Sequence, residues 1–236
     1  MIRKHYKLII FLLVIFVIFL IYKENHNHYF NYTSLGDGYA LGINSYSEID
    51  YGYSDYIKDE LLTDKRLKLY TKDFSKKDQS IEHLYESITT NEKITIDSME
   101  INLKQTLRES NLITMTIGLN DLIYHVAITP EMSEYQLNKI IEEIDNNLNK
   151  LIKEIKKYYP KTIYIIGYPN IPIENIYIKE GIDKLNELYQ NTKGVTYIST
   201  TDIISNSDFL NPNNIYPSKE GYKKIADKVL QKLNKN

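Results

Sequence analysis

The sequence predicts an α/β fold of three layers, in which helices cover both faces of a five-stranded parallel sheet, preceded by an N-terminal transmembrane helix. Two observations lead to this prediction. Short apolar runs with strand character alternate with helical patterns through most of the 236 residues, and such alternation favours a parallel sheet covered on both faces. Ahead of them stands one unbroken apolar run that follows a basic start. The length suits one domain with a short appendage.

The apolar run occupies residues 8–21 and predicts a membrane anchor. A bilayer span needs roughly 20 residues, and flanking tyrosines and lysines can extend a shorter core. Three basic residues precede the run and only Lys23 closely follows it, which places the N-terminus in the cytoplasm and the domain outside the plasma membrane. The polar segment after the run lacks the small residues of a cleavage site, so an uncleaved anchor is favoured over a cleaved signal peptide. The predicted divisions are a cytoplasmic start with its single-pass anchor (1–22), a tether (23–30) and one domain (31–236).

The elements of the domain follow from hydrophobic periodicity and turn residues. The expected strands are residues 32–35, 67–71, 112–117, 162–167 and 195–199. The expected helices are residues 51–62, 80–88, 98–109, 131–158, 176–190 and 218–233. Ligands of parallel α/β sheets bind beyond the carboxyl ends of the strands. The segments that follow the strands therefore form the candidate site.

The longest helix, residues 131–158, has the clearest signals. Thr129 is placed to cap it, Pro130 suits its first position, and Pro160 follows its end. One face carries an apolar stripe at helical spacing: Leu137, Ile140, Ile141, Ile144, Leu148, Leu151, Ile152 and Ile155. A stripe opposite a charged face predicts packing onto the sheet, with a coiled coil as the alternative.

Composition excludes several classes of protein. The formal net charge is −2 and both signs alternate along the helices, so the sequence does not indicate a nucleic-acid partner. The chain has no cysteine, which excludes disulfides and thiolate metal sites. His26 and His28 lack a third ligand nearby, and we predict neither a metal site nor a cofactor. We interpret the 22 tyrosines as codon bias rather than as a sign of function.

Three segments that follow expected strands carry the candidate chemistry. The first reads Ser-Leu-Gly-Asp-Gly-Tyr-Ala-Leu-Gly over residues 34–42, with Asp37 and Gly38 at its apex. Another reads Ile-Gly-Leu-Asn-Asp-Leu over residues 117–122 and contains Asn120. The last, Asn-Asn-Ile-Tyr-Pro over residues 213–217, lies just before the closing helix.

In their order and spacing, these segments resemble the catalytic blocks of the SGNH (GDSL-type) hydrolases, a superfamily of esterases and lipases. The resemblance covers residues 32–233 and implies the flavodoxin-like fold of that family. It places Gly38 at the position of the nucleophilic serine, Asn213 at that of the aspartate and Tyr216 at that of the histidine. In the second block Asp73 takes the place of the asparagine and Asp78 that of the glycine of the oxyanion hole. Asn120 matches the family's oxyanion-binding asparagine, and Tyr168 lies at the exit of the fourth strand.

The three altered positions remove the groups that the family's mechanism requires. Gly38 has no side chain to attack an acyl carbon. The unperturbed pKa of a tyrosine is about 10, so Tyr216 is a poor base near neutrality. Asn213 lacks the charge that stabilises an imidazolium. Because a serine hydrolase without its triad retains only roughly 10³–10⁴-fold acceleration over water, we expect an inactive pseudoenzyme that binds a ligand or partner at the cell envelope. The expected binding residues are Asp37, Gly38, Asn120, Tyr168 and Tyr216.

Two alternatives stay open. In the first, the chain is an active acyl esterase that uses displaced groups. His125 is then the candidate substitute base, because it follows Asn120 on the same rim. In the second, the chain is a scaffold subunit of a membrane complex that docks through the helix of residues 131–158. The sequence does not identify the ligand, the partner or the oligomeric state.

Overall fold

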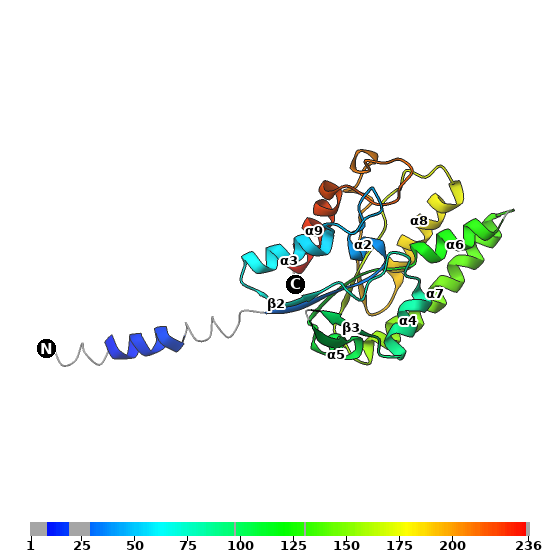
Figure 1. Cartoon of the computed structure of the whole chain (residues 1–236). Helices are drawn as coiled ribbons and strands as arrows, with labels where there is room; N and C mark the ends of the chain where they lie inside the picture. Colours follow the sequence, from blue (N-terminus) through cyan, green and yellow to red (C-terminus); the bar gives the residue numbers. More distant parts are fainter. Residues whose placement is uncertain (1–8, 19–28, 97, 130, 235–236) are drawn as a thin grey trace.

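The computed structural model describes residues 9–18, 29–96, 98–129 and 131–234. Its centre is the predicted five-stranded parallel sheet, in the order β2-β1-β5-β6-β7 (Figure 1). The strands are β1 (Phe30–Gly36), β2 (Leu67–Thr71), β5 (Leu112–Thr116), β6 (Ile163–Ile166) and β7 (Val195–Ile198). The central strand β5 is buried along its whole length, as expected for a parallel strand covered on both faces. The prediction of fold and strand positions is confirmed.

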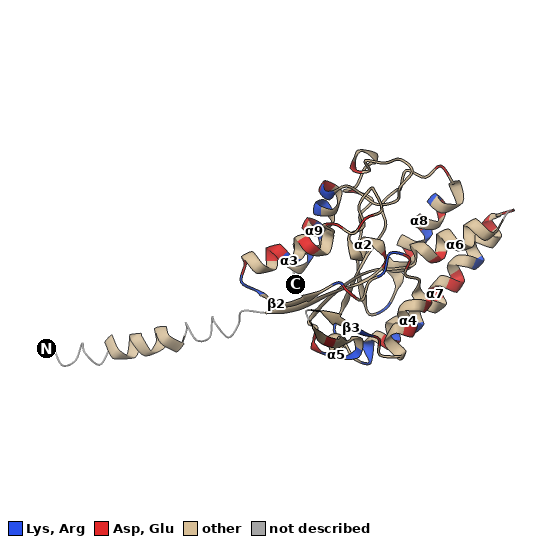
Figure 2. Cartoon of the chain, in the orientation of Figure 1, with Lys and Arg blue, Asp and Glu red and all other residues tan. Residues whose placement is uncertain are grey.

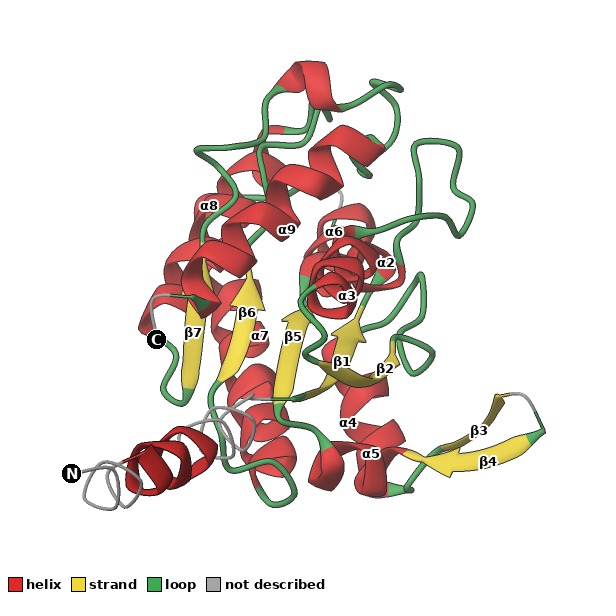
Figure 3. Cartoon of the chain, turned by 90° about the vertical axis from the view of Figure 1, so that its left-hand side faces the viewer, coloured by secondary structure: helices red, strands yellow, loops and turns green. Residues whose placement is uncertain are grey.

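Helices cover the sheet on both faces. On one side α3 (Tyr53–Thr63) packs against α9 (Lys219–Leu233), and on the other α7 (Glu134–Lys156) packs between α4 (Ile81–Thr89) and α8 (Ile176–Asn191). Lysine, arginine, aspartate and glutamate are interspersed over the outer surfaces of these helices (Figure 2). The carboxyl ends of the strands point toward the loops at the top of the view in Figure 3.

The structure corrects the start of the longest helix. α7 begins at Glu134, where Ser133 accepts a hydrogen bond from the backbone N–H of Gln136 and the Gln136 side chain accepts one from the N–H of Ser133. Thr129 instead ends the preceding helix α6 (Leu119–Ile128), and Pro130 lies outside the described residues. The apolar stripe of α7 is buried against its neighbours, so the coiled-coil alternative is wrong.

The helix predicted over residues 98–109 is also corrected. Its first part belongs to an antiparallel hairpin of β3 (Lys93–Ile96) and β4 (Met99–Asn102), and only α5 (Leu103–Glu109) is helical. Asn102 caps α5 by accepting from the N–H of Gln105. Apolar and polar residues alternate with period two through this hairpin, which is the strand signal that the helical interpretation overlooked. The short helices α2 (Gly38–Leu41) and α6 were not predicted either.

Residues 9–18 are helical, and each of them is between 42% and 61% exposed. No helix within the described ranges has the length and apolar character needed to span a bilayer. The rest of the predicted anchor, residues 1–8 and 19–22, lies outside those ranges.

Candidate functional site

The site begins where β1 ends. Gly36 adopts a φ of +122°, and a Cβ there would lie 1.7 Å from the carbonyl oxygen of Thr116, so the close approach of β1 to β5 requires a glycine. Asp37 then caps the short helix α2, accepting a hydrogen bond of 3.0 Å from the N–H of Tyr39. Gly38, the nucleophile position, is the first residue of α2.

Asp37 is only 2% exposed, and every hydrogen bond to it comes from a neutral donor. The hydroxyl of Thr116 donates to its Oδ1 at 2.7 Å, and the phenol of Tyr168 donates to its Oδ2. Burial raises the pKa of the Asp37 carboxyl to about 6, although the hydrogen bonds from Tyr168, Thr116 and Tyr39 lower it in part. The carboxyl of Asp37 is therefore held in place by hydrogen bonds that it accepts from within the protein.

The space above Gly38 is filled by Tyr216. A Cβ built on Gly38 would lie 2.3 Å from the Tyr216 hydroxyl oxygen and 2.6 Å from its ring. Tyr216 is 4% exposed, and burial, followed by the charges of Asp37 and Asp78, raises the pKa of its phenol above the usual range. The residue at the histidine position thus occupies the volume that a nucleophilic side chain would need, in a form that cannot act as a base.

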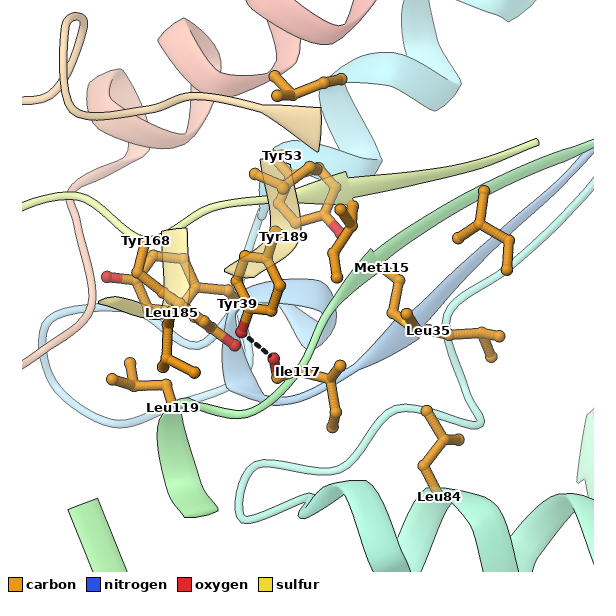
Figure 4. Packing of buried hydrophobic residues seen from close by; sticks show 14 of the residues in the cluster. Leu35, Tyr39, Tyr53, Leu84, Met115, Ile117, Leu119, Tyr168, Leu185 and Tyr189 are labelled. Carbon is orange, nitrogen blue, oxygen red and sulfur yellow. Dashed lines mark hydrogen bonds between the residues drawn. The ribbon is translucent and has the colours of Figure 1, made fainter. Parts of the chain in front are cut away.

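Tyr216 belongs to a cluster of buried tyrosines at the carboxyl ends of the strands. The ring of Tyr39 lies 5.3 Å from that of Tyr168, 5.6 Å from that of Tyr216 and 5.9 Å from that of Tyr222, measured between centroids. Figure 4 shows Tyr39, Tyr168 and Tyr189 gathered there, with the Tyr189 phenol donating to the carbonyl of Ile117. The cluster was missed from sequence, where the abundance of tyrosine was its only signal and was ascribed to codon bias.

Asn213, the aspartate position, is exposed, and its backbone N–H donates to the side chain of Asn211. The hydrogen bonds of the described residues include none between Asn213 and Tyr216. The segment is held instead by neighbours: Asn214 donates to the carbonyl of Ser45, and Ser45 donates to the carbonyl of Tyr216. The pairing that a catalytic triad requires is replaced by contacts that close the loop.

Asn120 is the residue type that the family has at this position, but its side-chain amide is already hydrogen-bonded within the protein. Its Nδ2 donates to the carbonyls of Lys77 and Gln79, at 3.1 and 3.0 Å. The adjacent Asp121 accepts from the N–H of Ile81 at the start of α4. Both side chains hold the loop of the second block against α6, so the amide hydrogens of Asn120 are not directed at an oxyanion site.

The loop of the second block carries a negative charge close to Tyr216. Asp78 is exposed, and its carboxylate lies near enough to raise the pKa of the Tyr216 phenol. A carboxylate there opposes a developing negative charge. Asp73, the other position in this block, accepts a hydrogen bond of 2.8 Å from Thr71.

A groove of about 600 Å³ runs between this loop and α4. It is lined by Lys76, Lys77, Asp78, Gln79, His83, Glu86, Ser87, Thr90 and Glu92. Gln79 is 1% exposed, and neither its amide nitrogen nor its amide oxygen has a hydrogen-bond partner among the described residues. A buried amide without partners is costly, so the side chain of Gln79 reduces the stability of the groove wall.

His125 does not replace the missing base. It is half-buried on α6 and its ring stacks edge-on against that of Tyr124. In the part of the chain that the structure describes, no hydrogen bond joins a histidine ring to a hydroxyl. Within the same part, no group of three or more histidine, aspartate or glutamate residues could hold a metal ion.

Comparisons with known proteins agree with this fold. The family model of the GDSL-like lipases/acylhydrolases matches residues 25–229. A lipase from a goat rumen metagenome is similar in structure, with 18% identity and a TM-score of 0.65 over 85% of this chain and 95% of that one. A GDSL-like lipase described as putative, from Parabacteroides merdae, shows 14% identity and a TM-score of 0.62, covering 87% and 95%. A catalytic mutant of an acetylxylan esterase from Geobacillus stearothermophilus shows 14% identity and a TM-score of 0.57, covering 86% and 94%.

No curated protein matches the chain in sequence. At these identities the solved structures establish the fold alone, and the family model, which spans most of the chain, establishes membership. The frame of the site is retained in order and position, from the β1 exit through the start of α6 to the loop before α9. The chain therefore belongs to the GDSL-like lipase/acylhydrolase family.

Proposed function

We propose that this protein is a catalytically inactive member of its family, held at the outer face of a membrane, where it binds a ligand or partner instead of cleaving an ester. One observation carries the proposal: the phenol of Tyr216 lies where the side chain of a nucleophile at position 38 would stand. An acyl substrate has neither an attacking oxygen nor room to approach one at this corner.

The remaining groups of the site support the same conclusion. Asn120 uses its amide hydrogens on the carbonyls of Lys77 and Gln79, and Asp78 adds a negative charge nearby. Loss of a single oxyanion donor costs about 10²–10³-fold in kcat, and here the nucleophile and the base are absent as well. Ligand binding finds its support in the neighbouring groove of about 600 Å³ between the loop of the second block and α4.

Membrane attachment rests on the N-terminal segment. Residues 9–18 are helical, apolar and exposed, and a basic start precedes them. Exposed apolar surface of this extent is typical of a segment that contacts lipid or another protein. A scaffold that docks through α7 is disfavoured, because the stripe on that helix is buried within the domain.

Ester hydrolysis and covalent labelling test the proposal. We expect the purified protein to hydrolyse p-nitrophenyl acetate no faster than a Gly38→Ala variant, and to remain unlabelled by a fluorophosphonate probe. Turnover at the rate of an ordinary family esterase, or labelling of a serine, would favour the active-esterase alternative and end the proposal of inactivity.

A further inference from the structure

The hairpin of β3 and β4 has one apolar face. Ile94 pairs with Ile101, and Ile96 pairs with Met99, across the two antiparallel strands. Since side chains alternate between the faces of a strand, these four lie on one side and the polar residues of the hairpin lie on the other. Ile94 and Ile101 pack against the core of the domain and cover part of this face, while Met99 is exposed.

That face overhangs an apolar groove of about 200 Å³. Side chains from β1, β2, the hairpin and α5 line it, among them Tyr32, Leu69, Tyr70, Ile96, Met99 and Ile101. Leu69 is 54% exposed and Met99 is 65% exposed. β2 is an edge strand, paired only with β1 among the described strands. Exposed apolar side chains beside an open sheet edge mark a contact surface.

The groove lies at the amino end of the sheet, opposite the tyrosine cluster. Asn31 and Tyr32, at the start of β1, belong to its lining. The chain that enters β1 comes from the apolar residues 9–18, and Tyr29 follows Ile18 by eleven residues. An extended chain of this length spans about 40 Å at most. The start of β1, which lines the groove, therefore lies no more than about 40 Å from residue 18.

Basic and acidic side chains both lie around this end of the domain (Figure 2). Lys65 and Arg66 lie just before β2, Lys68 lies on β2, and Lys104 and Arg108 lie on α5. The guanidinium of Arg66 stacks on Phe30, and that of Arg108 stacks on Tyr158. The ion pairs of the described residues involve none of these five side chains, so their charge is available to anionic headgroups, each contributing about 1 kcal/mol at a membrane surface.

We propose that the amino end of the sheet rests on an anionic lipid bilayer, with Met99 and Leu69 at the mouth of the groove facing the boundary between headgroups and acyl chains. Arg66, Lys104 and Arg108 then lie at the level of the lipid phosphates. This orientation rests on the proposed membrane attachment, and it turns the carboxyl ends of the strands, with the groove beside Gln79, away from the bilayer.

The absence of cysteine allows a direct test on the full chain. A Met99→Cys variant carries an environment-sensitive fluorophore at the hairpin, and a Tyr135→Cys variant carries it at the amino end of α7, where Tyr135 is 71% exposed. Both are reconstituted in phosphatidylcholine vesicles with and without phosphatidylglycerol. We expect the probe at position 99 to shift to shorter wavelength and to be quenched by spin-labelled lipid, more strongly with phosphatidylglycerol, while the probe at position 135 stays unchanged.

Replacing Arg66 and Arg108 by glutamine in the Met99→Cys variant should remove most of the gain due to phosphatidylglycerol. If the chain floats with the vesicles but both probes behave alike, the orientation is wrong and the attachment stands. If the chain does not float at all, attachment and orientation fail together. A shift at position 99 that appears in detergent without lipid and grows with protein concentration would assign the groove to a second copy of the chain and overturn the proposal.

Discussion

The corner at Gly38 and the groove beside Gln79 lie at the same rim of the sheet and differ in whether their polar groups are satisfied. At the corner, Tyr216 fills the space and three donors converge on Asp37. In the groove, the Gln79 amide is buried without a partner in the described chain. Filled volume and paired groups stabilise a fold, whereas unpaired buried groups reduce its stability. The corner is therefore packed like the core of the domain, and the unpaired amide lies beside it.

Rebuilding the catalytic triad should give the largest effect, which is the appearance of ester hydrolysis. In a Gly38→Ser/Asn213→Asp/Tyr216→His variant we expect hydrolysis of p-nitrophenyl acetate to appear, with a kcat still about 10²–10³-fold below that of an active family member, because the amide of Asn120 remains bonded to Lys77 and Gln79. The matched control carries Gly38→Ala with the other two changes and should stay inactive. A rebuilt variant as fast as an ordinary esterase would show that the oxyanion hole was intact.

The buried carboxyl of Asp37 makes the stability of the corner depend on pH. Its pKa is about 6 in the folded protein, against 3.8 for an unperturbed aspartate, so between these values the folded state binds more protons than the unfolded state. The free energy of unfolding should therefore fall as pH rises from about 4 to about 6, by up to about 3 kcal/mol at roughly 1.4 kcal/mol per pKa unit. Urea denaturation of the wild type and of an Asp37→Asn variant measures this. If the free energy of unfolding depends on pH equally in both proteins, the raised pKa of Asp37 is contradicted.

Adding a side chain to the filled corner should destabilise it. Gly38→Ser places a Cβ within 2.3 Å of the Tyr216 hydroxyl oxygen, and overpacking of this kind costs about 1–3 kcal/mol. Combining it with Tyr216→Ala should relieve the clash, so the double variant loses less stability than the sum of the two single changes. Strict additivity in urea denaturation would mean that the two residues do not compete for the same volume.

The smallest expected effects on the free energy of unfolding come from changing the side-chain amides of Gln79 and Asn120. Gln79→Met removes an unpaired buried amide and should raise the free energy of unfolding by about 1 kcal/mol. Asn120→Leu removes two hydrogen bonds to the loop of the second block and should lower it by about 1–2 kcal/mol. Both changes replace an amide by an apolar side chain of similar size. If urea denaturation shows that both changes shift the free energy of unfolding in the same direction, the amide of Gln79 does not differ from that of Asn120 in its hydrogen bonding.

Local patterns in the sequence determined much of this protein. Alternating strands and helices predicted the parallel sheet, and the stripe on α7 predicted its packing. The family's blocks predicted which loops meet at the rim and which groups were lost at positions 38, 213 and 216. These features depend on residues close together in the chain, or on an order that the whole family shares, so they can be recognised in one sequence.

Only the tertiary structure decided how the lost groups were replaced. The phenol of Tyr216 fills the volume above Gly38, and the amide of Asn120 turns to the second-block loop, because distant segments pack there. Strand β4 was likewise mistaken for the start of a helix, since a short apolar run fits either period until its partners are known. Side-chain volume and hydrogen-bond direction depend on neighbours far along the chain, which local pattern does not specify.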